Sequence, residues 1–346
     1  MNDRALRYQN LLETQEDVAE AASAMLAGGG QADVHLGADQ GWWAVAIPEA
    51  MGGAGGTVAD LAPVLEEAGA VTASTALPWT AGVVAPLLAS SSEDRAASLL
   101  EDIAAGTLAT SVPARGQRLA KDIGPLDPDD AVDASVLALG PAESLVLPLV
   151  VSGASCLVAV DLGTPGVRAT PVEGFDVSRP WTRYDLSGVA LGSAVVARVP
   201  DLFARWQSAM GVMCGLDSAG AARAALARTV EYASVRQQFG RALGSYQAYK
   251  HRCATALVEL KLAQSVAHRA AQAIGTPEEL PFALASALQS TRSATAVCEA
   301  AIQLHGGMGF SWESGLHRYL RRARANEILV GGEDSAAMLL ESLPRG

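Results

Sequence analysis

The amino-acid sequence predicts an α+β protein that is mainly helical. Apolar and small residues recur at helical spacing near both ends of the 346-residue chain. Between Thr110 and about Val199 the sequence changes to short β-rich runs separated by Gly, Pro and Asp. We therefore expect an N-terminal helical domain over 1–110, a small central β-barrel or β-sandwich over 111–200, and a C-terminal four-helix bundle over 201–346.

The N-terminal part contains four apolar segments that predict helices or compact turns. These segments are Leu11–Ala27, Trp42–Ile47, Val58–Ala70 and Ala97–Ala105. The glycine-rich stretch Ile47–Gly56 could suggest a phosphate cradle. However, it lacks the Gly-Lys-Ser/Thr ending of a nucleotide loop and follows no predicted strand. We interpret it as a loop that connects helices.

The rest of the chain divides into short strands and long helices. Five β-rich runs are expected, at Ser135–Leu139, Ser144–Ser152, Cys156–Asp161, Gly166–Thr170 and Val189–Arg198. Helices are expected at about 203–235, 245–275, 279–304, 312–330 and 334–343. Long antiparallel helices joined by short turns form a bundle with apolar seams.

Charge and composition argue against several classes of function. The net charge of −12 and the absence of a strong Lys/Arg footprint argue against nucleic acid as a partner. Four widely spaced cysteines without Cys-x-x-Cys spacing indicate small buried hydrophobes in a reducing compartment. The chain starts without a basic region and apolar run, and no segment reaches about 18 uncharged apolar residues. We expect a cytoplasmic protein with no membrane partner.

Two glycine-containing stretches carry the most information. In Val235–Gln247, Gly240 and Gly244 lie where one long helix must end and the next begin. In Gln303–Glu313, three glycines in four positions allow positive φ and leave amide N–H groups free to face an anion.

These stretches resemble the acyl-CoA dehydrogenase family, whose C-terminal domain carries Arg-x-x-Phe-Gly, then Phe-Gln or Tyr-Gln, then Gln-x-x-Gly-Gly. Leu316–Ala323 resembles the helix that follows, and Pro48–Gly55 resembles the family's Pro-Glu-x-x-Gly-Gly-x-Gly segment. The resemblance implies FAD-dependent α,β-dehydrogenation of an acyl-CoA thioester. In that reaction a carboxylate removes the α-proton and the β-hydrogen leaves as hydride. It also implies an acceptor such as electron transfer flavoprotein.

The resemblance assigns FAD contacts to two groups of residues. Arg236 matches an arginine at the pyrophosphate, Gln247 matches a glutamine toward the adenosine half, and Phe239 is expected to pack beneath the turn. A second group matches the turn that receives the pyrophosphate of an FAD held mainly by a neighbouring subunit: Gln303, Leu304, His305, Gly306 and Gly307. The alternative is a helix-end cation and a simple turn. No second ligand at metal spacing accompanies His305.

The resemblance places the catalytic glutamate at one of three positions. In one subgroup it lies near the C-terminus, where it falls on Gly331 here. Glu333, two residues away, is interpreted as facing solvent or capping the last helix. Other members carry it about seven or about five helical turns before the Arg-x-x-Phe-Gly turn, at Met210 or Asp217 here.

Asp217 is the candidate catalytic base. It follows Met210 and Met213 at helical spacing, on a stripe of apolar and small residues. A carboxylate on such a face is expected to have a raised pKa, which suits a base. The alternative is an aspartate that makes a local hydrogen bond or an ion pair with Arg223 or with a partner chain.

The central domain departs from the family pattern. Positions 110–150 lack the Thr-Glu-Pro…Gly-Ser-Asp loop and the Trp-Ile-Thr/Ser strand with which family members contact the flavin ring. We therefore expect an α2β2 hetero-oligomer with a homologous subunit, in which this chain has the less complete active site. Shortened, paired members act in actinobacterial steroid degradation, which suggests a bulky steroid-derived CoA ester. The alternatives are a non-catalytic FAD-binding subunit, or an oxidase on the same fold.

Overall fold

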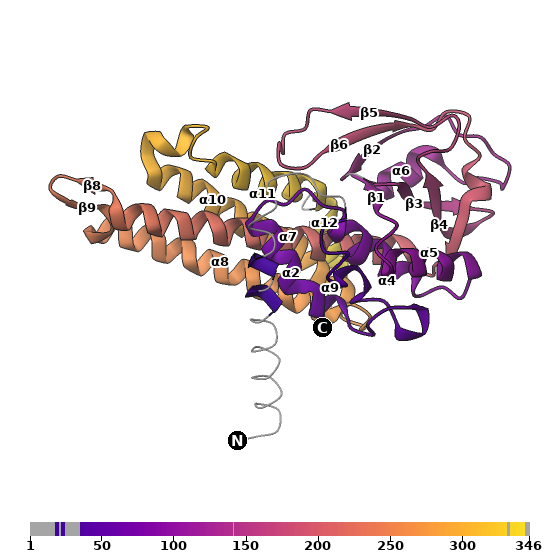
Figure 1. Cartoon of the computed structure of the whole chain (residues 1–346), viewed down its shortest axis with the longest axis horizontal. Coiled ribbons are helices and arrows are strands. Elements are labelled where there is room, and N and C mark those ends of the chain that lie inside the picture. Colours follow the sequence, from indigo (N-terminus) through magenta and orange to yellow (C-terminus); the bar gives the residue numbers. More distant parts are fainter. Residues whose placement is uncertain (1–17, 21, 25–34, 141, 331–332, 343–346) are drawn as a thin grey trace, which may run out of the picture.

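The structure is a computed structural model with a sheet at one end and long helices extending away from it (Figure 1). It describes residues 18–20, 22–24, 35–140, 142–330 and 333–342. The first expected helix, Leu11–Ala27, lies mostly outside these residues, although 18–20 and 22–24 are helical. No helix in the described part of the chain is long and apolar enough to span a membrane. The expected class, α+β and mainly α, is confirmed.

Two short 3-10 turns follow, Trp42–Ala44 before the predicted loop and Glu49–Met51 inside it. Helix α2 spans Val58–Ala70, as predicted, because Thr57 and Asp60 form a capping box before it. Helix α5 spans Asp94–Ala104. The helical segment between them was not predicted; it consists of α3 (Leu77–Trp79), a π turn (Thr80–Val84) and α4 (Ala85–Leu88).

A seven-stranded mixed sheet follows, in the order β5-β6-β2-β1-β3-β4-β7. Its strands are β1 (Thr110–Pro113), β2 (Ser135–Leu139), β3 (Ser144–Val151), β4 (Ala154–Asp161), β5 (Arg168–Val172), β6 (Trp181–Asp185) and β7 (Val195–Arg198). Strand β1 connects strands β5, β6 and β2 on one side of the sheet to β3, β4 and β7 on the other. Its first residues pair in parallel with β3, and its last residues pair antiparallel with β2.

The sheet region differs from expectation in one predicted run and in three elements that were not predicted. The run Val189–Arg198 is a strand only over its last four residues, because Leu191–Ala194 form a 3-10 turn. Strands β1 and β6 and helix α6 (Gly116–Ile123) were missed. Helix α6 places two basic residues and an acid on its outer side, and its polar composition gives a weak helical signal in a β-rich region.

The C-terminal helices agree closely with prediction. They are α7 (Leu202–Val235), α8 (Gln247–Ala273), α9 (Glu279–Ala285), α10 (Thr291–His305), α11 (Leu316–Val330) and α12 (Glu333–Ser342). A π turn at Ser286–Ser290 joins α9 to α10 within the expected helix 279–304. A two-stranded hairpin, β8 (Gln237–Gln238) and β9 (Arg241–Ala242), connects α7 to α8 at the end of the bundle farthest from the sheet (Figure 1).

Helix α7 is the central element of the fold. It is buried on all sides over most of its first half and packs against α2, α8, α10 and α11. A helix that is apolar all round belongs in a protein interior. Helices α2 and α7 cross where Gly69 faces the Asp217 carbonyl and Gly220 faces the Glu66 carbonyl. A Cβ built on Gly220 would lie 1.8 Å from that carbonyl oxygen, so only glycine allows this approach.

The substitution Gly220→Ala is expected to destabilise the protein by about 1–3 kcal/mol, because the two backbones must separate to admit the methyl group. Urea unfolding measures this change. Gly307→Ala is the matched control, since a Cβ there meets no atom within 4 Å. Equal stability of Gly220→Ala and the control would show that the helix crossing tolerates a methyl group.

Candidate functional site

The two glycine-containing stretches meet at the far end of the bundle. Arg236 caps the C-terminal end of α7, and Gly306 caps that of α10. With the first turns of α8 they line a cavity of about 520 Å³, which we call the distal cleft. Its lining comprises Tyr232, Arg236, Gln238, Leu243, Ala248, Tyr249, Arg252 and the five residues Gln303, Leu304, His305, Gly306 and Gly307.

The distal cleft is electropositive. Arg236 and Arg252 both line it, no Asp or Glu does, and neither arginine forms an ion pair with any other described residue. Nine other arginines of the described residues are paired with carboxylates. Two unpaired guanidinium groups on one cavity favour an anionic ligand, because their N–H groups suit phosphate oxygens.

The glycine turn is open to a ligand. Gly306 has a φ of +60°, and a Cβ built on Gly306 or Gly307 would meet no atom within 4 Å. Both glycines are exposed, so an approaching group can reach the backbone without a side chain in the way. This turn and the two arginines fit the pyrophosphate of a dinucleotide such as FAD.

Aromatic side chains fix the position of the turn. The Tyr249 hydroxyl donates a hydrogen bond to the Leu304 carbonyl at 3.2 Å, and burial raises the pKa of Tyr249 to about 12. The ring of His305 stacks on Tyr232, with 4.3 Å between centroids. His305 Nδ1 lies 2.8 Å from the Ala301 carbonyl oxygen, which can only accept. The proton therefore lies on Nδ1, and in the neutral ring Nε2 is an acceptor.

Two predicted cofactor residues do not line the cleft. Phe239 is 94% exposed at the tip of the hairpin, so the expectation that it packs beneath the turn is wrong for the single chain. Gln247 is the exposed first residue of α8, adjacent to the cleft. Three residues of the cleft were not predicted from the sequence: Tyr232, Tyr249 and Arg252. Helical spacing could have indicated Arg252, which lies one turn after Ala248.

Asp217 lies in a buried charge cluster at the other end of α7. It is 3% exposed and pairs with Arg179 and Arg322, each at 3.1 Å, while the Asn326 amide donates to it at 2.7 Å. Asp176 completes the cluster and pairs with Arg322 at 2.8 Å. We call these five residues the buried cluster. It joins the loop between β5 and β6 to α7 and α11.

This geometry favours the ion-pair alternative for Asp217, although with different partners from the one expected. Arg223 instead pairs with Glu66 and Glu67 on α2. Asp217 lines neither the distal cleft nor the pocket described below. A general base must come within hydrogen-bond reach of its substrate. The assignment of Asp217 as the catalytic base therefore stays a prediction. Its ion pairs with Arg179 and Arg322 do not favour that role.

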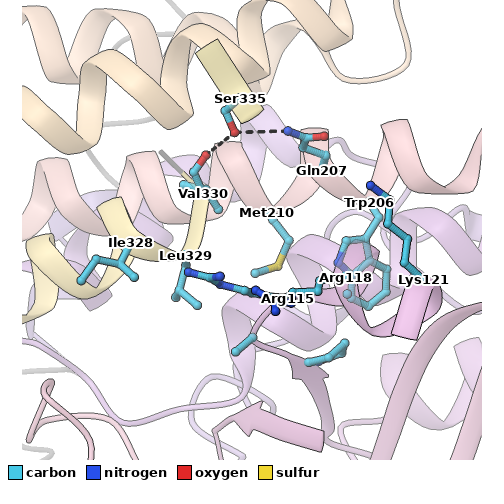
Figure 2. Close-up of a pocket in the computed structure, with 13 residues that line it drawn as sticks. Arg115, Arg118, Lys121, Trp206, Gln207, Met210, Ile328, Leu329, Val330 and Ser335 are labelled. Atoms are coloured by element: carbon cyan, nitrogen blue, oxygen red, sulfur yellow. Dashed lines mark hydrogen bonds between the residues drawn. The ribbon is translucent and has the colours of Figure 1, made fainter. Parts of the chain in front are cut away.

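The second cavity, of about 320 Å³, lies between the sheet and the bundle (Figure 2). We call it the proximal pocket. Its lining comprises Pro113, Ala114, Arg115, Gly116, Arg118, Lys121, Trp206, Gln207, Met210, Ile328, Leu329, Val330 and Ser335. Met210, one of the positions expected for the catalytic glutamate, lines this pocket. Val330 also lines it and immediately precedes Gly331, a second such position, which lies outside the described residues. Among the residues that the structure describes, no Asp or Glu lines this pocket.

Comparison with protein families gives two matches in chain order. Residues 14–107 match the model of the acyl-CoA dehydrogenase N-terminal domain, and residues 209–341 match that of the C-terminal domain. Together these segments contain the N-terminal helices and most of the bundle, including the distal cleft.

Two relatives from Mycobacterium tuberculosis are similar in sequence. Acyl-CoA dehydrogenase FadE34 is 32% identical over 84% of this chain, which spans only 39% of FadE34. Acyl-CoA dehydrogenase IpdE2 is 31% identical over 86% of this chain and 82% of its own length. The ChsE4-ChsE5 complex of the same organism has a similar fold, with a TM-score of 0.81 at 20% identity, covering 96% of this chain and 98% of the matched chain.

The substitution Asp217→Asn is expected to destabilise the protein by about 3–5 kcal/mol, because it leaves two buried guanidinium groups with one carboxylate. Urea unfolding at neutral pH measures the loss. The control Asp122→Asn removes an exposed partner of Arg118 and should change stability little. If both variants unfold alike, the buried cluster does not stabilise the fold.

Asp176 is expected to make the free energy of unfolding depend on pH in the acidic range. Burial alone would raise its pKa, but Arg322 and Arg179 outweigh burial and hold the pKa below the ordinary value of 3.8. The contribution of the ionised Asp176 to the free energy of unfolding is therefore fully present above about pH 3.8, the ordinary pKa of the unfolded chain. It is lost as the pH falls through the lower pKa that Asp176 has in the folded protein. The gap in unfolding free energy between the wild type and Asp176→Asn should narrow below pH 3.8. A gap that is constant from pH 7 to pH 3 would contradict this assignment.

Proposed function

The chain belongs to the acyl-CoA dehydrogenase family, and on this premise we propose that it is one subunit of an FAD-dependent acyl-CoA dehydrogenase that assembles with a homologous partner. The observation that supports this most is the distal cleft. It brings Arg236 and the 303–307 turn together around an electropositive cavity without any carboxylate. When bound, FAD would accept the hydride that leaves the β-carbon of the acyl group.

We assign the residues of the cleft as follows. Arg236 and Arg252 would hold phosphate oxygens through their guanidinium N–H groups, and the open backbone of Gly306 and Gly307 would allow the pyrophosphate to approach closely. His305 Nε2 would accept a hydrogen bond from a hydroxyl group of the cofactor. Gln247 and Phe239 lie outside the cleft and would contact a partner subunit or the adenosine half of FAD.

The length of α7 supports a cofactor shared with a neighbouring subunit. Arg236 follows Met210 by 26 residues, which at 1.5 Å per residue is roughly 39 Å. Fewer than ten covalent bonds join the pyrophosphate of FAD to its flavin ring, a reach of at most about 15 Å. An FAD molecule held at Arg236 therefore cannot place its ring in this chain's proximal pocket. Its ring would lie in a partner subunit.

Exposed apolar side chains around the distal cleft also favour a partner. Val235, Phe239, Met308 and Phe310 are all more than half exposed, and they come from the two turns that form the cleft. Large apolar groups clustered on a surface commonly mark a protein interface. We propose that the homologous partner covers these residues in an α2β2 assembly.

One observation favours the non-catalytic role for this chain. The described lining of the proximal pocket includes Met210 and Val330 and no carboxylate, and Asp217 is held by the buried cluster. We propose that the α-proton is removed by a base of the partner, while this chain supplies the phosphate-binding half of the site. The substrate would be an acyl-CoA. A steroid-derived acyl group and electron transfer flavoprotein as acceptor stay predictions.

The direct test is the flavin absorbance and native mass of the chain, purified alone and after co-expression with a homologous subunit encoded beside it. The proposal expects a colourless chain that forms a yellow hetero-oligomer with its partner. A yellow, active homo-oligomer of this chain alone would contradict the proposal.

Within the hetero-oligomer, Arg236→Gln is expected to weaken FAD binding roughly ten- to hundredfold, because one charge-assisted contact with phosphate is lost. Release of FAD on dilution, followed by flavin fluorescence, measures the change. Arg183→Gln, an exposed arginine on β6 away from both cavities, is the control. Equal FAD affinity in both variants would remove Arg236 from the binding site.

A further inference from the structure

We propose that a strip along α11 and the loop between β5 and β6 is the surface on which the homologous partner subunit docks. The strip consists of Phe175 and Val177 on the loop, Trp312 in the turn before α11, and Arg321 and Ile328 on α11, and we call it the lateral strip. The inference rests on the proposed function, because it identifies the side of the bundle that the partner covers. Three features support it: a stacked aromatic centre, a rigid support, and the area that a stable pair of subunits needs.

A stacked arginine joins the parts of the lateral strip. The Arg321 guanidinium carbon lies 5.5 Å from the centroid of the Phe175 ring and 5.2 Å from that of the Trp312 ring, and Arg321 Nη1 donates to the Phe175 carbonyl at 3.4 Å. Both aromatic side chains nevertheless stay open to solvent, since Phe175 is 55% and Trp312 is 67% exposed. Tryptophan and arginine are among the residues that contribute most binding energy at protein interfaces.

A buried ion pair supports the lateral strip from behind. Phe175 precedes Asp176 and Arg321 precedes Arg322, and the two inner residues form an ion pair at 2.8 Å. The loop and the helix therefore contact each other twice, through a stacked pair outside and an ion pair inside. A surface that is fixed in this way loses little conformational freedom on docking, so more of its contact energy becomes affinity. The strip is preformed in the single chain.

The lateral strip extends from the distal cleft toward the sheet. Ile328 is 61% exposed and follows Arg321 by seven residues, or two helical turns, so both lie on one face of α11. At the other end, Met308 and Phe310 at the distal cleft lie within four residues of Trp312. Figure 1 shows α11 and the loop between β5 and β6 on one side of α7, with α8 on the other. The strip therefore continues the exposed apolar surface of the cleft along one side of the bundle.

The area of the exposed side chains explains why a docking surface needs the lateral strip. A large side chain presents roughly 150–250 Å² when it is fully exposed. On that scale the four exposed apolar residues at the distal cleft offer roughly 500 Å², and the strip adds roughly 400 Å². A stable interface buries roughly 800 Å² on each partner. The residues at the cleft alone offer too little, whereas the two surfaces together offer enough.

The homologous subunit that holds the flavin ring is the partner that fits this surface. An FAD molecule bound at Arg236 reaches at most about 15 Å toward its ring. The subunit that receives the ring must therefore lie directly against the bundle beside the distal cleft, where the lateral strip begins. On α11, Arg318 and Arg321 form no ion pair with any other described residue, whereas Arg322 and Arg324 do. We expect the partner to place acidic side chains opposite the two unpaired arginines.

Alanine substitutions in the co-expressed hetero-oligomer test the inference. Trp312→Ala and Phe175→Ala should each weaken subunit association at least tenfold, because each removes an aromatic group from the centre of the interface. Dissociation on dilution, followed by native mass spectrometry, measures the change. Trp312→Phe keeps an apolar ring and should retain most of the affinity. Val258→Ala is the matched control, since Val258 is 67% exposed on α8, and circular dichroism verifies the fold of every variant.

The outcomes decide which side of the bundle the partner covers. Association that is unchanged in both Trp312→Ala and Phe175→Ala would overturn the inference. Loss of association in Val258→Ala alone would also overturn it, because the partner would then cover α8. Hydrogen exchange gives a second readout without any substitution. The amides of 173–178 and 311–316 should exchange more slowly in the hetero-oligomer than in the chain alone, and equal exchange would count against docking at the strip.

FAD content separates this inference from the proposed function. A Trp312→Ala hetero-oligomer that stays assembled and yellow would overturn the lateral strip and leave the proposed function intact. A hetero-oligomer whose assembly depends on Trp312 but that binds no FAD would support the strip and contradict the proposed function. A chain that assembles only with itself, or with no partner, would contradict both.

Discussion

The arrangement of the protein depends on the buried cluster of two arginines and two aspartates. Each charge taken out of water costs several kcal/mol unless a partner and hydrogen bonds offset it. Here Arg179 and Arg322 each have both aspartates nearby, and Asn326 donates to one of them. The Arg322 guanidinium also donates to the carbonyls of Thr72 and Ala73 after α2. One cluster therefore connects the sheet, the end of α2 and the bundle.

Features that are local in the sequence could be predicted from it. The ends of α2, α7, α8 and α10 follow from apolar periodicity and from the residues that stop helices, and the 303–307 turn follows from its glycines. Arg236 and this turn could be assigned to one site because the resemblance covers both stretches. Features that depend on contacts between distant residues could not be predicted. Arg322 and Asp217 are 105 residues apart, and no pattern in either helix indicates that they meet.

The differences from expectation have physical reasons. Asp217 lies on an apolar helix stripe, which suggested an unpaired carboxylate, but the loop between β5 and β6 brings Arg179 onto the same face. Helix α6 was missed because it is eight residues long and mostly polar outside its packed side. Phe239 is exposed because the hairpin extends beyond the bundle, so the single chain offers it no core. In each case the sequence shows which residue is present, but its environment is set by residues that are distant in the sequence.

Helix α7 holds the distal cleft and the proximal pocket on one straight element, farther apart than one cofactor can reach. If each cleft serves an adjacent homologous subunit encoded by a second gene, as we propose, no copy of this chain can complete a flavin site by itself. The amount of holoenzyme in a cell would then follow the scarcer of the two gene products, by mass action. Any excess of this chain would remain without cofactor, with its apolar rim uncovered. Balanced synthesis of the two subunits would therefore matter for solubility as much as for turnover.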